Sequence, residues 1–167
     1  PLLVAQGKLF IPMDLSQQEH LKAYGVTFRA LEKELKADWL LNYQGGAFMI
    51  DYSPAVAADC RIEGVTYREL SQADAVMIYS EVQSEENNTE VIRLEKAPKI
   101  AVYVPPGFQP WDDAVTLVLE YAKISYDKIW NTEIMRGDLS KYDWLHLHHE
   151  DFTGQYGKFY ASYSNAQ

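Results

Sequence analysis

Near the start of the chain, apolar and polar positions follow an order that predicts a strand, a helix and a second strand. Residues 8–14 have the pattern of a short apolar strand. Ser16 can cap a helix that runs to about Leu35, because the apolar positions recur mostly at helical spacing. Residues 39–43 then have the pattern of a second strand. This order is typical of a β-α-β unit.

The same order recurs later in the chain. A strand pattern at residues 99–104 is followed by a Pro-Gly turn, a helix at about residues 111–123 and a strand at residues 126–130. Successive β-α-β units place their strands side by side with right-handed crossovers. The predicted fold class is therefore α/β, with a mainly parallel central sheet and helices on both faces.

The residues between these units carry weaker signals. Gly45 and Gly46 precede the apolar run 47–50, and a short strand pattern at residues 64–67 precedes a helix pattern at 71–82. Two hydrophilic stretches bracket the predicted linker, which lies within residues 84–98.

These patterns predict one α/β domain over residues 8–167, with β-α-β units at 8–52 and 99–151 joined by residues 53–98. Residues 1–7 are apolar and small, which fits the remnant of a signal peptide and equally fits an edge strand. The first alternative predicts an exported, periplasmic protein, and the second leaves a cytoplasmic location.

Composition excludes several classes of protein. The chain has 167 residues, of which 47% are hydrophobic, so it can bury a sizeable core. Its formal net charge of −9 disfavours binding to nucleic acid, because phosphate backbones would be repelled. No apolar run approaches the length of about 20 residues that a membrane span requires. The single cysteine, Cys60, excludes an internal disulfide.

The main candidate chemistry lies where the last strand pattern ends. In an extended strand, His146, His148 and Glu150 would project from one face and His149 from the other. Two imidazoles and a carboxylate on one face can bind zinc, iron or manganese. Two alternatives are open: these side chains and Asp151 contact a ligand directly, or they only hold the following loop by hydrogen bonds.

The predicted sheet places further polar residues near the same edge. In an open parallel sheet, ligands bind at the carboxyl ends of the strands. Asp14 and His20 follow the first strand, and Trp111 and Asp112 follow the third. We therefore expect them to line one crevice with residues 148–151. Asp112 and Asp113 also fit a plainer role as acids at a helix N-terminus.

Nucleophilic and nucleotide-dependent chemistry has no support in these residues. Cys60 is not in an elbow-like context, no Gly-x-Ser-x-Gly is present, and Cys60 is most simply a small buried apolar residue. No Gly-x-Gly-x-x-Gly follows either leading strand. No organic cofactor is therefore expected, and a divalent metal ion is the one candidate.

Several segments carry a resemblance to a known family. Residues 20–25, 39–46, 110–117 and 142–157 together resemble exported bacterial proteins that are often labelled asparagine synthetase B. The stretch 99–151 is similar to the opening strands of the class I glutamine amidotransferase-like fold, which has a flavodoxin-like parallel sheet. The resemblance implies a domain truncated at its C-terminus, with the catalytic nucleophile outside this chain.

Three functions follow as hypotheses; the third is a carbohydrate or cell-surface interaction module, suggested by twelve tyrosines and four tryptophans. The first is an amidotransferase-like α/β domain that binds a small polar ligand or a protein partner at the strand edge near residues 148–151. The second is a metal-dependent hydrolase that uses His146, His148 and Glu150. Whether the chain is an enzyme, and its oligomeric state, are left open by these residues.

Overall fold

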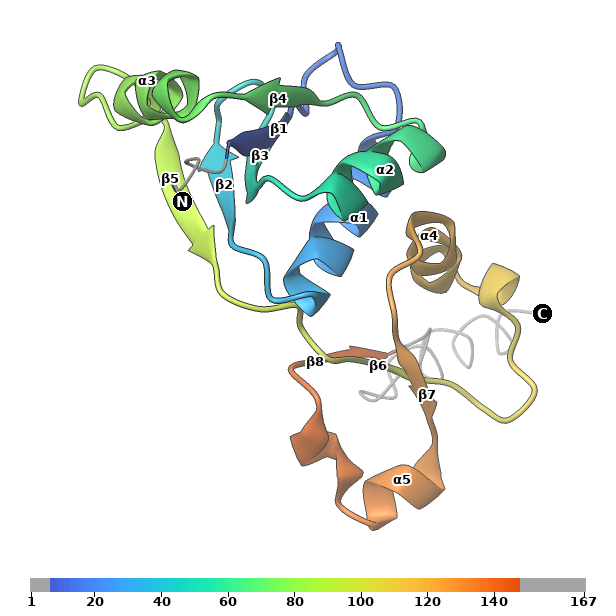
Figure 1. Ribbon diagram of the computed structural model, residues 1–167. Helices are drawn as coiled ribbons and strands as arrows, with labels where there is room; N and C mark the ends of the chain where they lie inside the picture. The colour runs from blue at the N-terminus through green and yellow to red at the C-terminus, as the bar shows by residue number, and fades with distance from the viewer. Residues whose placement is uncertain (1–6, 148–167) are drawn as a thin grey trace, which may run out of the picture. The chain divides into compact units, whose positions relative to one another are not determined.

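The computed structural model describes residues 7–147 (Figure 1). The chain divides into two compact units. Unit 1 comprises the residues up to 98 together with 110–125, and unit 2 comprises 99–109 and the residues from 126 onward. Within the described range, no helix has the length and apolar character needed to cross a membrane.

Unit 1 is built on a five-stranded sheet. Each strand pairs with its neighbours in the antiparallel sense. The strands are β1 (Lys8–Ile11), β2 (Ala37–Leu41), β3 (Ala47–Asp51), β4 (Arg68–Leu70) and β5 (Glu90–Leu94), in the order β4-β1-β3-β2-β5.

Four helices belong to unit 1: α1 (His20–Glu32), α2 (Pro54–Glu63), α3 (Gln72–Val82) and α4 (Ala114–Ala122), the last preceded by the 3₁₀ turn η1 (Pro110–Asp112). The first six elements run β-α-β-β-α-β with the sheet order β4-β1-β3-β2, which is the ferredoxin-like, split β-α-β arrangement. The helix α3 and the edge strand β5 extend it.

Side-chain alternation along the strands gives unit 1 a separate core on each face of its sheet. One face packs against α1 and α2, and its buried residues include Leu9, Ile11, Ala37, Phe48 and Ile50. The other face packs against α3, and its buried strand residues are Phe10, Leu40, Ala47 and Met49. The unit is therefore a three-layer α/β/α arrangement, with α3 on the opposite side from α1 and α2 (Figure 1).

Unit 2 contains a three-stranded parallel sheet. Its elements are β6 (Ile100–Tyr103), β7 (Asp127–Ile129), α5 (Asn131–Met135), the 3₁₀ helix η2 (Asp138–Lys141) and β8 (Trp144–Leu147), with the strand order β7-β6-β8. One face of this sheet buries Ala101, Tyr103 and Ile129, and the ring of Tyr103 stacks on Trp130 with centroids 4.6 Å apart.

The predicted mainly parallel central sheet is wrong. The strands β1 and β2 of the first predicted β-α-β unit are not neighbours, because β3 lies between them and pairs with both. The connection from Leu41 to Ala47 is a hairpin turn with positive φ at Asn42, Gln44, Gly45 and Gly46. A parallel connection would need roughly a dozen or more residues, so this short turn forces β3 to run antiparallel to β2.

The sequence patterns also do not predict several elements, among them β5 and α2. The predicted linker contains β5, which pairs with β2 along its whole length. The connecting stretch also contains α2, which starts with proline at its first turn and ends at Gly64 in the left-handed conformation. Parallel pairing is confined, among the described residues, to β6 with β7 and β6 with β8.

Candidate binding pocket

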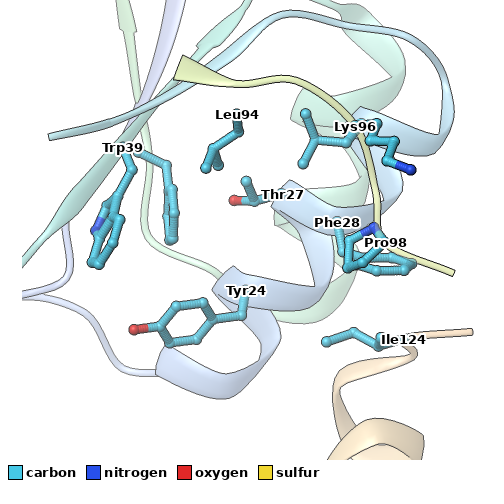
Figure 2. Close-up of a pocket in the computed structure, with 10 residues that line it drawn as sticks. Tyr24, Thr27, Phe28, Trp39, Leu94, Lys96, Pro98 and Ile124 are labelled. Carbon is cyan, nitrogen blue, oxygen red and sulfur yellow. The ribbon is translucent and has the colours of Figure 1, made fainter. Parts of the chain in front are cut away.

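A pocket of about 370 Å³ opens on the α1 face of the unit 1 sheet (Figure 2). It lies between α1, the strands β2 and β3, the chain that leaves β5, and the residue that follows the C-terminal end of α4. The lining residues are Tyr24, Thr27, Phe28, Leu31, Trp39, Phe48, Leu94, Lys96, Pro98 and Ile124. All of them belong to unit 1.

The floor of the pocket follows from strand pairing. Trp39 on β2 lies opposite Phe48 on β3, so the two aromatic side chains emerge on the same face of the sheet. Tyr24 of α1 meets the Phe48 ring edge-on, with centroids 5.4 Å apart. Leu94, at the end of β5, continues this apolar surface toward the edge of the sheet. A cross-strand aromatic pair therefore forms the base of the pocket.

The polar atoms of the lining are mostly committed to the protein itself. The Thr27 hydroxyl donates to the carbonyl of Ala23 at 3.0 Å, and the Trp39 indole N–H donates to the carbonyl of Gly46 at 3.0 Å. Figure 2 shows Lys96 at the rim, with its ammonium group directed away from the aromatic side chains. The interior is consequently apolar and best suited to an apolar occupant.

The wall at Ile124 is fixed by contacts between α4 and the two other helices of this face. Arg29 of α1 pairs with Asp59 of α2 through two N–H···O bonds of 2.9 and 3.1 Å. The same guanidinium donates to the carbonyls of Ala122 and Lys123 at 2.9 and 3.1 Å. A cation at a helix C-terminus is favourable because it binds otherwise unpaired carbonyls.

Asp14 and His20 lie close together in unit 1, but they organise a loop. The Ser16 amide and hydroxyl donate to the Asp14 carboxylate at 2.9 and 2.5 Å, and these hydrogen bonds lower the pKa of Asp14. The Nε2 atom of His20 lies 3.2 Å from the carbonyl of Met13 and 3.1 Å from that of Asp14. Neither residue lines the pocket.

Trp111 and Asp112 lie in η1, also in unit 1. Trp111 is 69% exposed. The neighbouring Asp113, rather than Asp112, caps α4: its buried carboxylate accepts from the backbone amides of Val115 and Thr116. The sequence could not distinguish these two adjacent acids.

Of the predicted metal-binding residues, the structure describes only His146. It lies on β8 opposite Val102 of β6, in unit 2, and is partly buried. His148, His149, Glu150 and Asp151 lie outside the described residues. Across residues 7–147, no group of three or more histidine, cysteine or acidic side chains is placed to hold a metal ion.

Cys60 is fully buried in α2, as the sequence analysis expected. Burial raises the pKa of its thiol to about 12, with a further contribution from the nearby Asp59 carboxylate. The reactive species of cysteine is the thiolate. Cys60 is therefore a packing residue rather than a nucleophile.

Comparison of the chain with protein-family models, with curated proteins and with solved structures gave no match.

Sequence reasoning missed the pocket because its parts are distant along the chain. The sequence pattern places Trp39 only in a strand, and it places Leu94 and Pro98 in the predicted linker. The one available signal was the Gly45-Gly46 pair, which fits a hairpin turn. Recognising that turn would have paired Trp39 with Phe48.

Proposed function

We propose that this chain is a small-molecule-binding protein and that the pocket on the α1 face of unit 1 is its binding site. The observation that carries the proposal is the pocket's size together with its apolar lining. Its volume of about 370 Å³ lies in the range of roughly 300–1,000 Å³ typical of ligand sites. It is more than twice the roughly 150 Å³ of an apolar cavity that binds benzene. A bicyclic aromatic group is of suitable size.

Packing energetics supports the proposal. Protein interiors normally fill space to crystal-like density, so an apolar space of this size is unusual in a well-packed sheet face. Trp39, Leu31 and Leu94 are only partly buried beside it. A bound apolar group would remove their exposed surfaces from water, which is favourable at roughly 25 cal/mol per Å².

Fluorine NMR on protein labelled with 5-fluorotryptophan tests this proposal, with indole as the probe. The chain has four tryptophans, and Trp39 is the one that lines the pocket. We expect a saturable shift of the Trp39 resonance, assigned with the Trp39→Phe variant. The resonances of Trp111, Trp130 and Trp144 serve as internal references and should stay in place.

A pair of leucine-to-tryptophan variants locates the binding site. Leu94→Trp should fill the pocket and weaken indole binding at least tenfold. Leu15→Trp makes the same change at a fully exposed leucine outside the pocket and should leave binding unchanged. Equal affinities in the two variants, or a wild-type protein that shows no saturable shift, would contradict the proposed site.

A second candidate is the polar-ligand site at the strand edge, now limited to the sheet of unit 2. The strand order of this sheet, β7-β6-β8, is the specific observation that favours the second candidate. The chain adds β7 on one side of β6 and then β8 on the other. In open α/β sheets, ligands bind outside the carboxyl ends of strands where this direction reverses. At that end, the Tyr103 hydroxyl donates to Asn131 at 2.6 Å.

The metal-dependent hydrolase and the amidotransferase-like relationship stay predictions from the sequence. Metal analysis of the purified, untagged protein tests the hydrolase. Stoichiometric zinc, iron or manganese that is lost in His146→Ala and His148→Ala would favour it. A folded protein that takes up none of these metals when they are supplied would contradict the hydrolase hypothesis.

A further inference from the structure

We infer that α4 is a detachable wall of the pocket, so that docking of α4 and occupation of the pocket promote each other. The inference rests on the proposed function, since it concerns the regulation of the same site. It assigns to α4 a conformational role that neither its sequence nor its length suggests.

The first argument is that the end of α4 fixes the position of a pocket residue. Lys123 ends the helix in the left-handed conformation, with φ of 56°. The next amide, that of Ile124, donates back to the carbonyl of Leu119 at 2.9 Å. Ile124 thereby turns sharply off the helix end and lines the pocket. If α4 detaches from α1, Ile124 moves with the helix and the pocket loses this wall.

The second argument is that docking of α4 requires its C-terminal end to approach α1 closely. A Cβ atom added at Gly25 would lie 1.8 Å from the carbonyl oxygen of Ala122 and 2.8 Å from its carbon. Such distances are far inside van der Waals contact, so no other residue fits at position 25 while α4 is docked. The contact places the Ala122 carbonyl within reach of Arg29.

The third argument is that few side chains of α4 are buried: Thr116, Leu119 and Ala122. The exposed Lys123 pairs with the buried carboxylate of Glu63, whereas the contact of Tyr121 with Glu19, at 2.7 Å, is exposed. Exposed polar pairs contribute little to stability. Leu117 and Tyr121 remain about half exposed on α4. A helix held by few buried side chains can detach while the sheet and the other helices stay folded.

Reciprocity turns this geometry into a measurable relation. If undocking of α4 removes one wall, the ligand binds the docked state more tightly. The factor by which docking raises affinity must then equal the factor by which the ligand raises docking.

The experiment measures indole affinity and hydrogen exchange of α4 in the full chain. Gly25→Ala should lower indole affinity several-fold and speed amide exchange over residues 114–122. The change raises helix propensity at that position, so a weakened α1 cannot explain the loss. In the wild type, saturating indole should slow exchange over the same residues relative to β1 and β3.

Arg29→Met, with Lys33→Met as its control, provides a milder test should Gly25→Ala fail to fold. Arg29 binds the end of α4, whereas Lys33 is an exposed residue at the end of α1. We expect weaker indole binding and faster α4 exchange only in Arg29→Met. The wild type could bind indole without a change in α4 exchange, while Gly25→Ala binds as the wild type does and Arg29→Met as Lys33→Met does. In that case the coupling is wrong and the binding site stands. If the wild type binds no indole, both proposals fall.

Discussion

The two faces of the antiparallel sheet in unit 1 are built from the same five strands but are closed to different degrees. On the α3 face, Phe10, Leu40 and Met49 are fully buried beneath the helix. On the α1 face, Trp39 and Leu94 stay partly exposed beside the pocket. The residues alternate along the same strands, so the difference lies in the helices that cover each face.

The covering helices contact the sheet through different side chains. The helix α3 buries Ala75 and Val82 against the sheet, and its Tyr79 donates to the buried carboxylate of Asp38 at 2.6 Å. The helix α1 packs on the sheet through Ala23, Val26 and Ala30. Trp39 on β2 and Leu94 on β5 keep part of their surface uncovered. The pocket is therefore a consequence of which residues face inward on α1.

The largest expected effect comes from removing a phenylalanine on each face. Phe10→Ala should lower the free energy of unfolding by about 3–5 kcal/mol, because it leaves a closed cavity beneath α3. Phe48→Ala should cost at least about 1 kcal/mol less, because the space it leaves joins the existing pocket. Urea unfolding of both variants measures this. Equal losses would mean that the two faces are packed equally tightly.

A smaller effect is expected from the buried acid of the α3 face. Asp38 is 3% exposed and accepts from Tyr79 and from Arg93 on β5. Asp38→Asn should cost about 1–3 kcal/mol, since it weakens both bonds in a buried site. Asp51→Asn is the control, because the Asp51 side chain is 33% exposed and its pair with Lys8 should contribute less than about 1 kcal/mol. The same unfolding measurement compares the two, and a larger loss at Asp51 would overturn the comparison.

The helix caps provide a third contrast. Ser71 forms a capping box with Asp74 at the start of α3, whereas Ser53 precedes α2 without a side-chain cap bond. Ser71→Ala should cost about 1 kcal/mol, and Ser53→Ala less than about 0.5 kcal/mol. Thermal unfolding with hydrogen exchange over α3 checks both. Equal losses of stability in Ser71→Ala and Ser53→Ala would show that the side-chain cap of α3 adds nothing to its stability.

The smallest effect appears only in alkali, where Cys60 on the α1 face and Tyr79 on the α3 face titrate. Burial raises the pKa of Cys60 to about 12, and burial with the Asp38 hydrogen bond raises that of Tyr79. Both groups hold their proton more tightly when folded. Their contributions are therefore complete below the unfolded pKa values, about 8.5 for the thiol and 10 for the phenol, and decline as pH rises above them.

Cys60→Ala should flatten the alkaline fall in unfolding free energy from about pH 8.5 upward, and Tyr79→Phe only above about pH 10. Urea unfolding across the range pH 7 to 11 gives the slopes. Variants that keep the wild-type slope would show that these groups titrate alike in the folded and unfolded chains.

Much of the local structure was predictable from the sequence. The helix expected at residues 71–82 is α3, and the strand patterns at 8–14, 99–104 and 126–130 contain β1, β6 and β7. Hydrophobic periodicity identifies such segments one at a time. It does not say which strands become neighbours, and the insertion of β3 between β1 and β2 changed the fold class.

The candidate site was not predictable for the same reason. The sequence prediction favours imidazoles and acids as site residues, and so it includes Asp14 and His20. In the structure these two residues organise a loop. The pocket is instead made of ordinary apolar residues, such as Tyr24 and Ile124, which meet only because α4 docks on α1. Tertiary contacts of this kind leave no local pattern.

The close approach at Gly25 also offers a way to classify sequences. Any chain of this fold with a side chain at the equivalent position must hold its last crossover helix further from α1, or not at all. This one position would then separate proteins whose apolar pocket has its α4 wall from proteins whose pocket lacks that wall.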